Sequence, residues 1–368
     1  MQQPRVLMMA AGTGGHVFPA IAVAQALQKS GAEVHWLGTL TGMENDLLQN
    51  YDFIYHAIGM QGLRGNGLKR LLQAPTTLLK ATLATIKIIQ SNHIDIVVGF
   101  GGYVTAPGGL AAKICKKPIV IHEQNAIVGM SNRYLSKLAN QVLEAFPNTF
   151  TEVPTSKVVT VGNPVRDAIV QVAPPNQRIH LDDPSPLKLL VIGGSLGAQA
   201  LNNSIAPTLK KLENLPAAAA WQVRHQCGKN NLQDTQAVYD QADLQNTPYE
   251  ILPFVQDMAA AYAWADVIVC RAGALTVTEV ATVGLPAVFV PLPHAVDDHQ
   301  TANAKTLSQQ QAAFLLPQKD LNADSLCQIL SGLDRQKLLA MAQKAREFAN
   351  PTATQHAAQI VLDQLNRS

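Results

Sequence analysis

Short apolar runs alternate along the chain with longer segments of helical periodicity, and glycine, proline or polar residues separate the two. The runs are predicted to be buried strands, because they are brief, continuous and rich in valine, isoleucine and leucine. In order, they cover residues 6–11, 34–37, 95–98, 119–121, 187–192 and 265–270. Strands that alternate with helices in this way are typical of an α/β fold with parallel sheets.

The strand, glycine turn and helix that open the chain occur again in its second half. Strand 6–11 leads through Gly12–His16 into a helix from about Pro19 to Ser30, and strand 187–192 leads through Gly193–Gly197 into another. We therefore expect two Rossmann-like, doubly wound domains that face each other across a cleft. The expected division is 1–163 and 164–350, and the last helix, about 351–368, is expected to pack back on the first domain.

Length and composition agree with two domains. The 368 residues are too many for one hydrophobic core, and no apolar run is long enough to span a membrane. The N-terminus lacks a signal-peptide pattern. The cysteines are widely separated, which argues against a zinc site or a disulfide framework and for a reducing cytoplasm; they are Cys115, Cys227, Cys270 and Cys327. The net charge is only +2 and no nucleic-acid-binding motif accompanies it, so nucleic acid is not an expected partner.

The segment around residues 265–284 is the strongest candidate for a ligand site. A predicted strand leads through the turn Arg271–Ala274 into a helix that ends at Gly284. The first N–H groups of such a helix can bind a phosphate. Glu279 lies about 7 Å further along the helix axis, where a carboxylate could accept hydrogen bonds from ribose hydroxyls. The same residues also fit an ordinary turn in which Glu279 faces solvent.

Two glycine turns in the first half suit anions. Gly12–His16 lacks the third glycine of a dinucleotide fingerprint, and the chain contains no P-loop motif. His16 could contact a phosphate or relay a proton there. A second turn at 101–103 and the polar run His122–Asn125 also follow predicted strands. Because ligands bind outside the carboxyl ends of such strands, these loops are expected to converge on a diphosphate.

A polar segment at 294–303 resembles a metal cluster only superficially. His294, Asp297, Asp298 and His299 have no standard zinc spacing, so we expect no metal. The amides of Gln300 and Asn303 suit sugar hydroxyls instead, since these need paired donors and acceptors.

Residues 62–89 combine an apolar sequence with interspersed basic residues, among them Lys69, Arg70, Lys80 and Lys87. This composition suits a membrane surface, and it equally suits an amphipathic helix packed on its own sheet.

Together these motifs resemble the MurG family, the bacterial UDP-N-acetylglucosamine:lipid I N-acetylglucosaminyltransferases of peptidoglycan synthesis, in glycosyltransferase family 28. The matching segments run nearly from end to end: 12–16, 101–103, 122–125, 162–166, 193–195, 271–279 and 300–303. The resemblance implies a GT-B fold and metal-independent, inverting transfer of GlcNAc from UDP-GlcNAc to the 4-hydroxyl of lipid I, giving lipid II, without a cofactor. It also implies a peripheral position on the cytoplasmic side of the inner membrane, through residues 62–89, among other cell-wall synthesis proteins.

The resemblance also implies roles for individual residues. The second domain would hold UDP-GlcNAc, with Glu279 on the ribose, Val255 at the uracil and the first domain closing over the donor. The residues that match family donor-site positions are Thr13, Gly14, Gly15, Asn125, Arg166, Ser195, Val255, Ala274, Leu275, Thr276, Val277, Thr278, Glu279, Gln300 and Asn303. The acceptor diphosphate would lie near Gly14, Gly15, Gly101, Gly102 and Tyr103.

The expected general base is His16, with Glu123 as the second candidate. Three other functions stay open. A GT-B relative could act on another acceptor. A UDP-GlcNAc 2-epimerase would share the nucleotide site but have no use for the segment 62–89. A non-catalytic nucleotide-sugar sensor would keep Glu279 but tolerate loss of His16.

Overall fold

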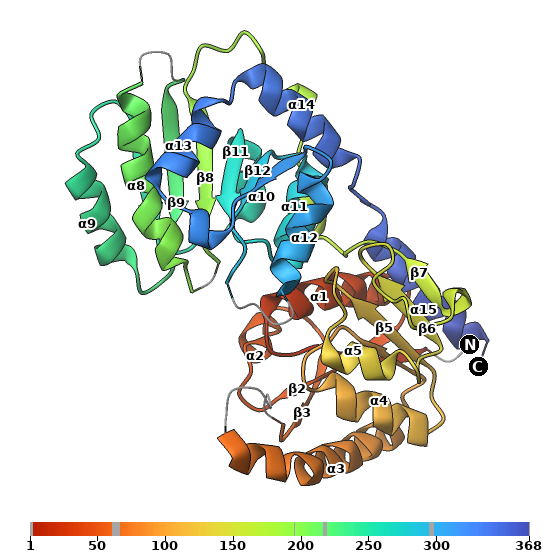
Figure 1. The fold of residues 1–368 in the computed structure, drawn as a ribbon. Helices are drawn as coiled ribbons and strands as arrows, with labels where there is room; N and C mark the ends of the chain where they lie inside the picture. Colours follow the sequence, from red (N-terminus) through yellow and green to blue (C-terminus); the bar gives the residue numbers. More distant parts are fainter. Residues whose placement is uncertain (1–2, 61–66, 195, 216–218, 294–297, 368) are drawn as a thin grey trace. The chain divides into compact units, whose positions relative to one another are not determined.

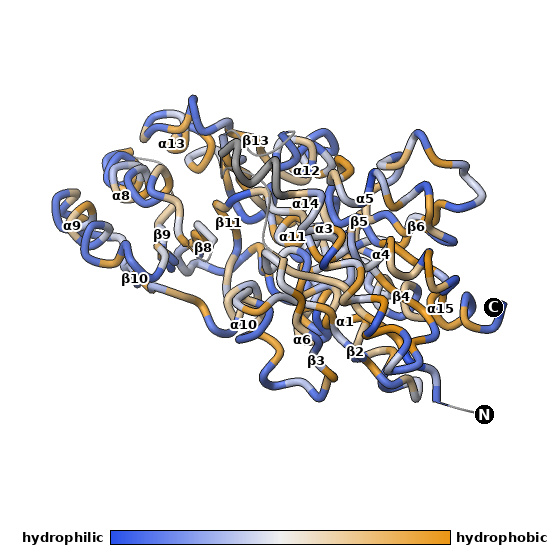
Figure 2. The backbone as a smooth tube through the Cα atoms, turned by 90° about the horizontal axis from the view of Figure 1, so that it is seen from below, coloured by the Kyte–Doolittle hydropathy of each residue, from blue (hydrophilic) through white to orange (hydrophobic). Residues whose placement is uncertain are grey.

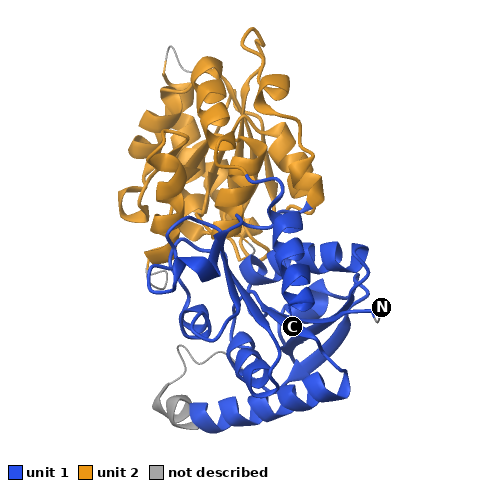
Figure 3. Ribbon diagram, turned by 90° about the vertical axis from the view of Figure 1, so that its right-hand side faces the viewer, with its two compact units in different colours: residues 1–166, 350–368 blue, residues 167–349 orange. Residues whose placement is uncertain are grey.

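The computed structural model describes residues 3–60, 67–194, 196–215, 219–293 and 298–367. The chain divides into two compact units, shown in Figure 3. Unit 1 comprises residues 1–166 and 350–368, and unit 2 comprises residues 167–349. The boundary expected from the sequence, after residue 163, falls slightly before this one.

Unit 1 is built on a seven-stranded parallel sheet with the order β3-β2-β1-β4-β5-β6-β7 (Figure 1). Its strands are β1 (Arg5–Met9), β2 (Glu33–Thr39), β3 (Ile54–Ile58), β4 (Ile96–Gly99), β5 (Ile119–Glu123), β6 (Gln141–Glu144) and β7 (Val158–Thr160). Its helices are α1 (Gly14–Lys29), α2 (Glu44–Leu47), α3 (Gly67–Ser91), α4 (Thr105–Ile114), α5 (Met130–Leu135), α15 (Ala353–Asn366) and the 3-10 helix η1 (Thr155–Lys157).

Both faces of this sheet are covered by helices. Val6 and Met8 of β1 pack in one core with α1 and α15, whereas Leu7 and Met9 pack in a second core with α3, α4 and α5. Successive side chains of a strand point to opposite faces, so a strand buried on both sides is apolar throughout. Figure 2 shows mainly hydrophobic colour along β4.

Unit 2 contains a six-stranded parallel sheet with the order β10-β9-β8-β11-β12-β13. Its strands are β8 (Leu187–Ile192), β9 (Trp221–Gln226), β10 (Tyr249–Leu252), β11 (Val267–Cys270), β12 (Ala287–Phe289) and β13 (Ala313–Leu315). Its helices are α6 (Asp167–Val170), α7 (Pro175–Arg178), α8 (Gln199–Glu213), α9 (Leu232–Ala242), α10 (Met258–Trp264), α11 (Ala274–Val283), α12 (His299–Ser308), α13 (Ala323–Ser331), α14 (Arg335–Arg346) and the 3-10 helix η3 (Gln318–Asp320).

The strand order reverses at the same place in both sheets. In unit 1, β1 lies between β2 and β4, and in unit 2, β8 lies between β9 and β11. Ligands of doubly wound sheets bind outside the carboxyl ends of the strands at this switch point. The turns that follow β1 and β4 in unit 1, and β8 and β11 in unit 2, are the glycine-containing turns identified in the sequence. The predicted α/β class with two doubly wound sheets is confirmed.

Two predicted boundaries are wrong in informative ways. Helix α1 begins at Gly14, well before Pro19, because Thr13 is extended (φ −131°, ψ 154°) and its carbonyl accepts the N–H of Val17. Glycine weakens a helix interior but is tolerated in the first turn, so the glycines concealed this start. Strand β5 continues through Glu123, where the sequence placed the end at residue 121.

Candidate active site

The N-terminus of α11 lies at the switch point of unit 2. Gly273 is the extended N-cap (φ −61°, ψ 143°), and its carbonyl accepts the N–H of Val277 at 2.9 Å. The N–H groups of Ala274, Leu275 and Thr276 precede this first intrahelical donor, so helix geometry leaves them directed out of the helix. With the positive end of the helix dipole, such N–H groups can bind an anion, and the phosphate contact expected here stays a prediction.

Glu279 lies in the same helix, and only 4% of its surface is exposed. The hydroxyl of Tyr262, from α10, donates to its Oε2 at 2.9 Å. This contact fixes the direction of the carboxylate. The solvent-facing alternative for Glu279 is therefore wrong, whereas its contact with a ribose stays a prediction. The sequence analysis did not identify Tyr262. It lies among mostly small residues in α10, and no motif there indicates a ligand site.

Three further residues of unit 2 form hydrogen bonds to the loops near α11. The guanidinium of Arg271 donates to the carbonyl of Val290 at 3.1 Å and to Gln318 at 2.6 Å, so it braces the end of β12. Asn303 is buried and its amide donates to the carbonyl of Ala272 at 3.2 Å. Gln300 accepts the N–H of Leu292 at 2.9 Å through its side chain.

For other predicted donor-site residues, the structure shows the packing or bonding of the side chain but does not test a contact with the donor. The side chain of Val277 belongs to the core, so a donor contact there would have to come from its backbone. The hydroxyl of Thr278 donates to the carbonyl of Ala274 at 3.0 Å. Ser195, His294 and Asp297 lie outside the described residues. Within those residues, no group of three or more His, Cys, Asp or Glu side chains is arranged to hold a metal.

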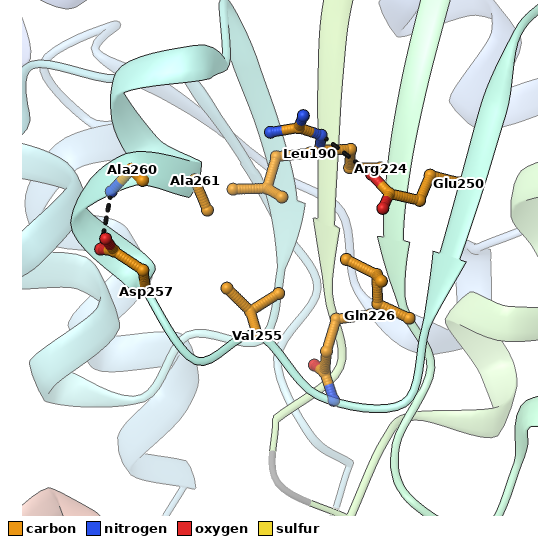
Figure 4. Close-up of a pocket in the computed structure, with 9 residues that line it drawn as sticks. Leu190, Arg224, Gln226, Glu250, Val255, Asp257, Ala260 and Ala261 are labelled. Atoms are coloured by element: carbon orange, nitrogen blue, oxygen red, sulfur yellow. Dashed lines mark hydrogen bonds and ion pairs between the residues drawn. The ribbon is translucent and has the colours of Figure 1, made fainter.

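Val255 lines a cavity of about 260 Å³ beside the sheet of unit 2 (Figure 4). The cavity lies between the face of β8, β9 and β10 and the start of α10. Its polar lining comes from Arg224, Gln226, Glu250 and Asp257, and the Arg224 Nε lies 3.1 Å from Glu250 Oε2. This cavity is large enough for one planar base. If Val255 contacts the uracil, as predicted, the uracil would lie in this cavity.

In unit 1, the two glycine turns lie against each other. A Cβ on Gly101 would lie 2.8 Å from Cδ2 of His16, so the imidazole packs directly over the glycine. A Cβ on Gly12 would lie 3.3 Å from the ring of Tyr103. Both glycines have positive φ (99° and 100°), which disfavours any other residue. The Oγ1 of Thr13 lies 3.4 Å from Nδ1 of His16. The structure thus brings together the residues that the sequence assigned to the acceptor diphosphate.

Glu123 is buried and its carboxylate is surrounded by donors. Its Oε1 accepts the backbone N–H and side-chain amide of Asn125, at 3.1 and 3.2 Å. Its Oε2 accepts the N–H of Gly129 and the amide of Asn132, both at 3.0 Å. These four contacts fix the carboxylate in place, and two of them also hold Asn125. The catalytic roles expected for His16 and for Glu123 both stay predictions.

Two further buried side chains, those of Glu44 and Trp36, support the turn after β1. Glu44 accepts the N–H and hydroxyl of Thr39, at 3.0 and 2.7 Å, and the N–H of Gly12 at 3.3 Å. The indole N–H of Trp36 donates to the carbonyl of Ala10 at 3.1 Å. No local sequence pattern predicts the contacts to Gly12 and Ala10, because each connects segments more than twenty residues apart.

His122 connects β5 to the segment that leaves unit 1. Its Nε2 lies 2.9 Å from the carbonyl of Gly162, and complete burial lowers the pKa of its imidazole to about 4. At neutral pH the ring is therefore uncharged, donates through Nε2 and accepts at Nδ1 from the Gln124 amide at 3.1 Å. Further along, the guanidinium of Arg166 lies over the ring of Phe18, 5.2 Å from its centroid.

Comparisons with known proteins agree with this geometry. Residues 6–144 match the glycosyltransferase family 28 N-terminal domain, and residues 188–360 match the C-terminal domain of that family. A relative from Psychrobacter cryohalolentis is 59% identical over 98% of this chain and 99% of its own. It is named UDP-N-acetylglucosamine--N-acetylmuramyl-(pentapeptide) pyrophosphoryl-undecaprenol N-acetylglucosamine transferase. A relative of the same name from Acinetobacter baumannii is 51% identical over 97% of this chain and 96% of its own.

Solved structures extend the likeness to three dimensions. The crystal structure of Acinetobacter baumannii MurG has a TM-score of 0.84 and 49% identity, and the match covers 98% of this chain and 99% of that one. A structure of S. aureus MnaA with UDP has a TM-score of 0.67 at 15% identity, covers 99% of this chain and 97% of its own, and shares the fold alone. The chain therefore belongs to glycosyltransferase family 28 and, within it, to the MurG family.

Proposed function

We propose that this chain transfers GlcNAc from UDP-GlcNAc to the 4-hydroxyl of the MurNAc of lipid I, giving lipid II and UDP. The observation that carries the proposal is the N-terminus of α11, at a switch point, with the buried carboxylate of Glu279 one and a half turns into the helix. A nucleoside diphosphate has a matching arrangement of phosphates and ribose hydroxyls. The names of close relatives specify the sugar and the acceptor.

The proposed chemistry is an inverting displacement. The acceptor hydroxyl attacks the anomeric carbon, the bond to the diphosphate breaks, and UDP leaves with increased negative charge. The N–H groups of Ala274, Leu275 and Thr276 stabilise that charge, with Arg166 as a further cation. The mechanism requires no metal.

His16 takes the proton of the attacking hydroxyl in this scheme. Its ring lies at the junction of the two glycine turns that we assign to the acceptor diphosphate, and a neutral imidazole is a suitable base near pH 7. Glu123 acts by holding Asn125 and the loop after β5.

The test is release of UDP from UDP-GlcNAc with and without a soluble lipid I analogue, in the presence of a chelator. We expect release that depends on the acceptor and survives chelation. His16→Ala should slow it about 10²- to 10⁴-fold without weakening UDP-GlcNAc binding. The matched control is His356→Ala, a change of an exposed histidine on α15, which should leave the rate unchanged.

Other outcomes would indicate other functions. Conversion of UDP-GlcNAc to its 2-epimer without acceptor would identify an epimerase, and tight donor binding with no turnover at all would identify a sensor. Either result would refute the transferase.

We also propose that unit 1 binds the cytoplasmic surface of the membrane through α3, which would bring the protein to its lipid acceptor. Ala81, Thr85 and Ile89 are buried, whereas Leu79 and Leu83, one turn apart, are 60% and 57% exposed. Lys80 and Lys87 are exposed on the same helix. An exposed apolar stripe with lysines beside it is suited to anionic lipid. The side chains of Lys69 and Arg70 lie outside the described part, and none of the described helices is long and apolar enough to cross a bilayer.

The membrane proposal is tested by sedimentation with vesicles that contain anionic lipid. Replacing Lys69, Arg70 and Lys80 with glutamate should weaken binding by at least about tenfold, because each basic residue near the surface contributes about 1 kcal/mol. Lys319→Glu, an exposed change in unit 2, is the control. Binding that is unchanged in the triple variant would refute the role of α3.

A further inference from the structure

Gln226 lies between two loops whose sequences carry the predicted donor-site residues Ser195 and Val255. It is the last residue of β9, and β9 lies between β8 and β10 in the sheet. The turn after β8, which begins at Gly193 and leads into α8, carries Ser195, which matches a family position that assists at the donor phosphates and itself lies outside the described residues. The loop after β10 contains Val255, where the uracil contact is predicted. A side chain at the end of the middle strand can therefore reach both loops.

The side chain of Gln226 bonds to both. It is buried, and its Nε2 donates to the carbonyl of Gly194 at 2.9 Å and to the carbonyl of Pro253 at 3.3 Å. An amide nitrogen has two hydrogens, so these bonds use its full donor capacity. The backbone adds a third link, because the N–H of Gly193 lies 3.4 Å from the carbonyl of Gln226.

Neither loop has a regular structure that would fix it without such bonds. Gly194 has φ +91°, a conformation that places its carbonyl outside any helix or strand pattern. Pro253 begins the segment that carries Val255 past the cavity to Asp257, which caps α10 through the N–H of Ala260 at 2.9 Å. Figure 4 shows the amide of Gln226 at the rim of that cavity, where β9 ends.

We propose that Gln226 is a positioning residue for the donor, which holds the nucleobase loop and the phosphate turn in fixed register. It need not touch UDP. A ligand that bridges two loops gains affinity only while their separation matches its length, because the second contact then forms at high effective concentration. This inference rests on the donor half of the proposed function alone.

The test compares UDP with uridine, a fragment that needs only the nucleoside side of the site. Gln226→Met keeps the volume of the side chain but removes both donors. Calorimetry should show UDP binding weakened about tenfold, equivalent to about 1.4 kcal/mol, and uridine binding changed by less than about twofold. In turnover, the KM for UDP-GlcNAc should rise while the KM for the acceptor stays constant.

Gln222→Met is the matched control, because Gln222 lies on the same face of β9 at the strand's opposite end. It should bind UDP as the wild type does. Unchanged UDP affinity in Gln226→Met would overturn the proposal. Equal loss of UDP and uridine affinity would overturn it too, since that result means a damaged nucleoside pocket and no role in register.

A second variant guards against misfolding of the first. Gln226→Glu is isosteric but presents a carboxylate to two carbonyl oxygens, and it should show the same selective loss of UDP affinity near pH 7. Retention of wild-type UDP affinity by this variant would refute the inference. Because the titrations with UDP and uridine need no acceptor, failure of lipid-linked transfer in the wild type would leave their result interpretable.

Discussion

The strongest quantitative prediction concerns the carboxylate of Glu279. In the structure it is 4% exposed, and the hydroxyl of Tyr262 donates to it at 2.9 Å. A hydrogen bond to a charged group contributes about 1.5–3 kcal/mol. Glu279→Ala should therefore weaken UDP binding about 10- to 150-fold. Tyr262→Phe leaves the carboxylate in place but removes its orienting donor, so a smaller loss of about fivefold is expected, near 1 kcal/mol.

The assay is calorimetric titration with UDP and with 2′,3′-dideoxy-UDP. Wild-type protein should prefer UDP by the full factor, because only UDP offers the ribose hydroxyls. In Glu279→Ala the two ligands should bind alike, and in Tyr262→Phe the preference should be intermediate. Tyr249→Phe is the control, since Tyr249 lies on β10 and is 38% exposed.

One result would refute the reasoning. If Glu279→Ala still preferred UDP over the dideoxy analogue by the wild-type factor, the carboxylate would not contact the ribose. Its burial would then serve only to satisfy the hydroxyl of Tyr262, and the variant would show a lowered free energy of unfolding without a change in ligand preference.

Three further predictions concern stability. Burial lowers the pKa of His122 from about 6.5 to about 4, so between these pH values the unfolded chain binds more protons than the folded chain. The contribution of His122 to stability is therefore full above pH 6.5 and falls toward pH 4. Urea unfolding should show a loss of about 2 kcal/mol in the free energy of unfolding by pH 5, and His122→Asn should reduce this dependence on pH. Glu44→Ala removes the acceptor of three donors and should lower the free energy of unfolding, measured with urea, by about 3 kcal/mol. The control is Glu347→Ala, a change of an exposed residue, which should cost under about 0.5 kcal/mol. Gly284→Ala should lower the free energy of unfolding by more than about 2 kcal/mol, because the residue has φ +66° and its Cβ would lie 2.6 Å from Arg346. The control is Gly31→Ala, where φ is +90° but no atom lies within 4 Å of the new Cβ, and it should cost about 1 kcal/mol. Equal losses in the two variants would exclude a contribution from the clash with Arg346.

The sequence by itself determined the class of the fold and the places where ligands could bind. Continuous apolar runs such as 187–192 mean strands buried on both faces, and such strands occur in parallel sheets covered by helices. A glycine turn between a buried strand and a helix places backbone N–H groups at a helix start. These signals are local, because they depend on neighbours in the chain, and the strand 187–192 and the helix ending at Gly284 were predicted nearly to the residue.

Only the tertiary structure decided which side chains share a site and what each one does there. The order of the strands brings Gly101 against His16, and no local pattern contains that order. Burial surrounds the carboxylate of Glu123 with four donors, and it gives Glu279 a partner on another helix. Gln226 acquires its two bonds only because β9 lies between β8 and β10. Burial and hydrogen bonding between distant segments depend on the packing of the whole unit, and that information is spread over all its contacts rather than carried by a motif.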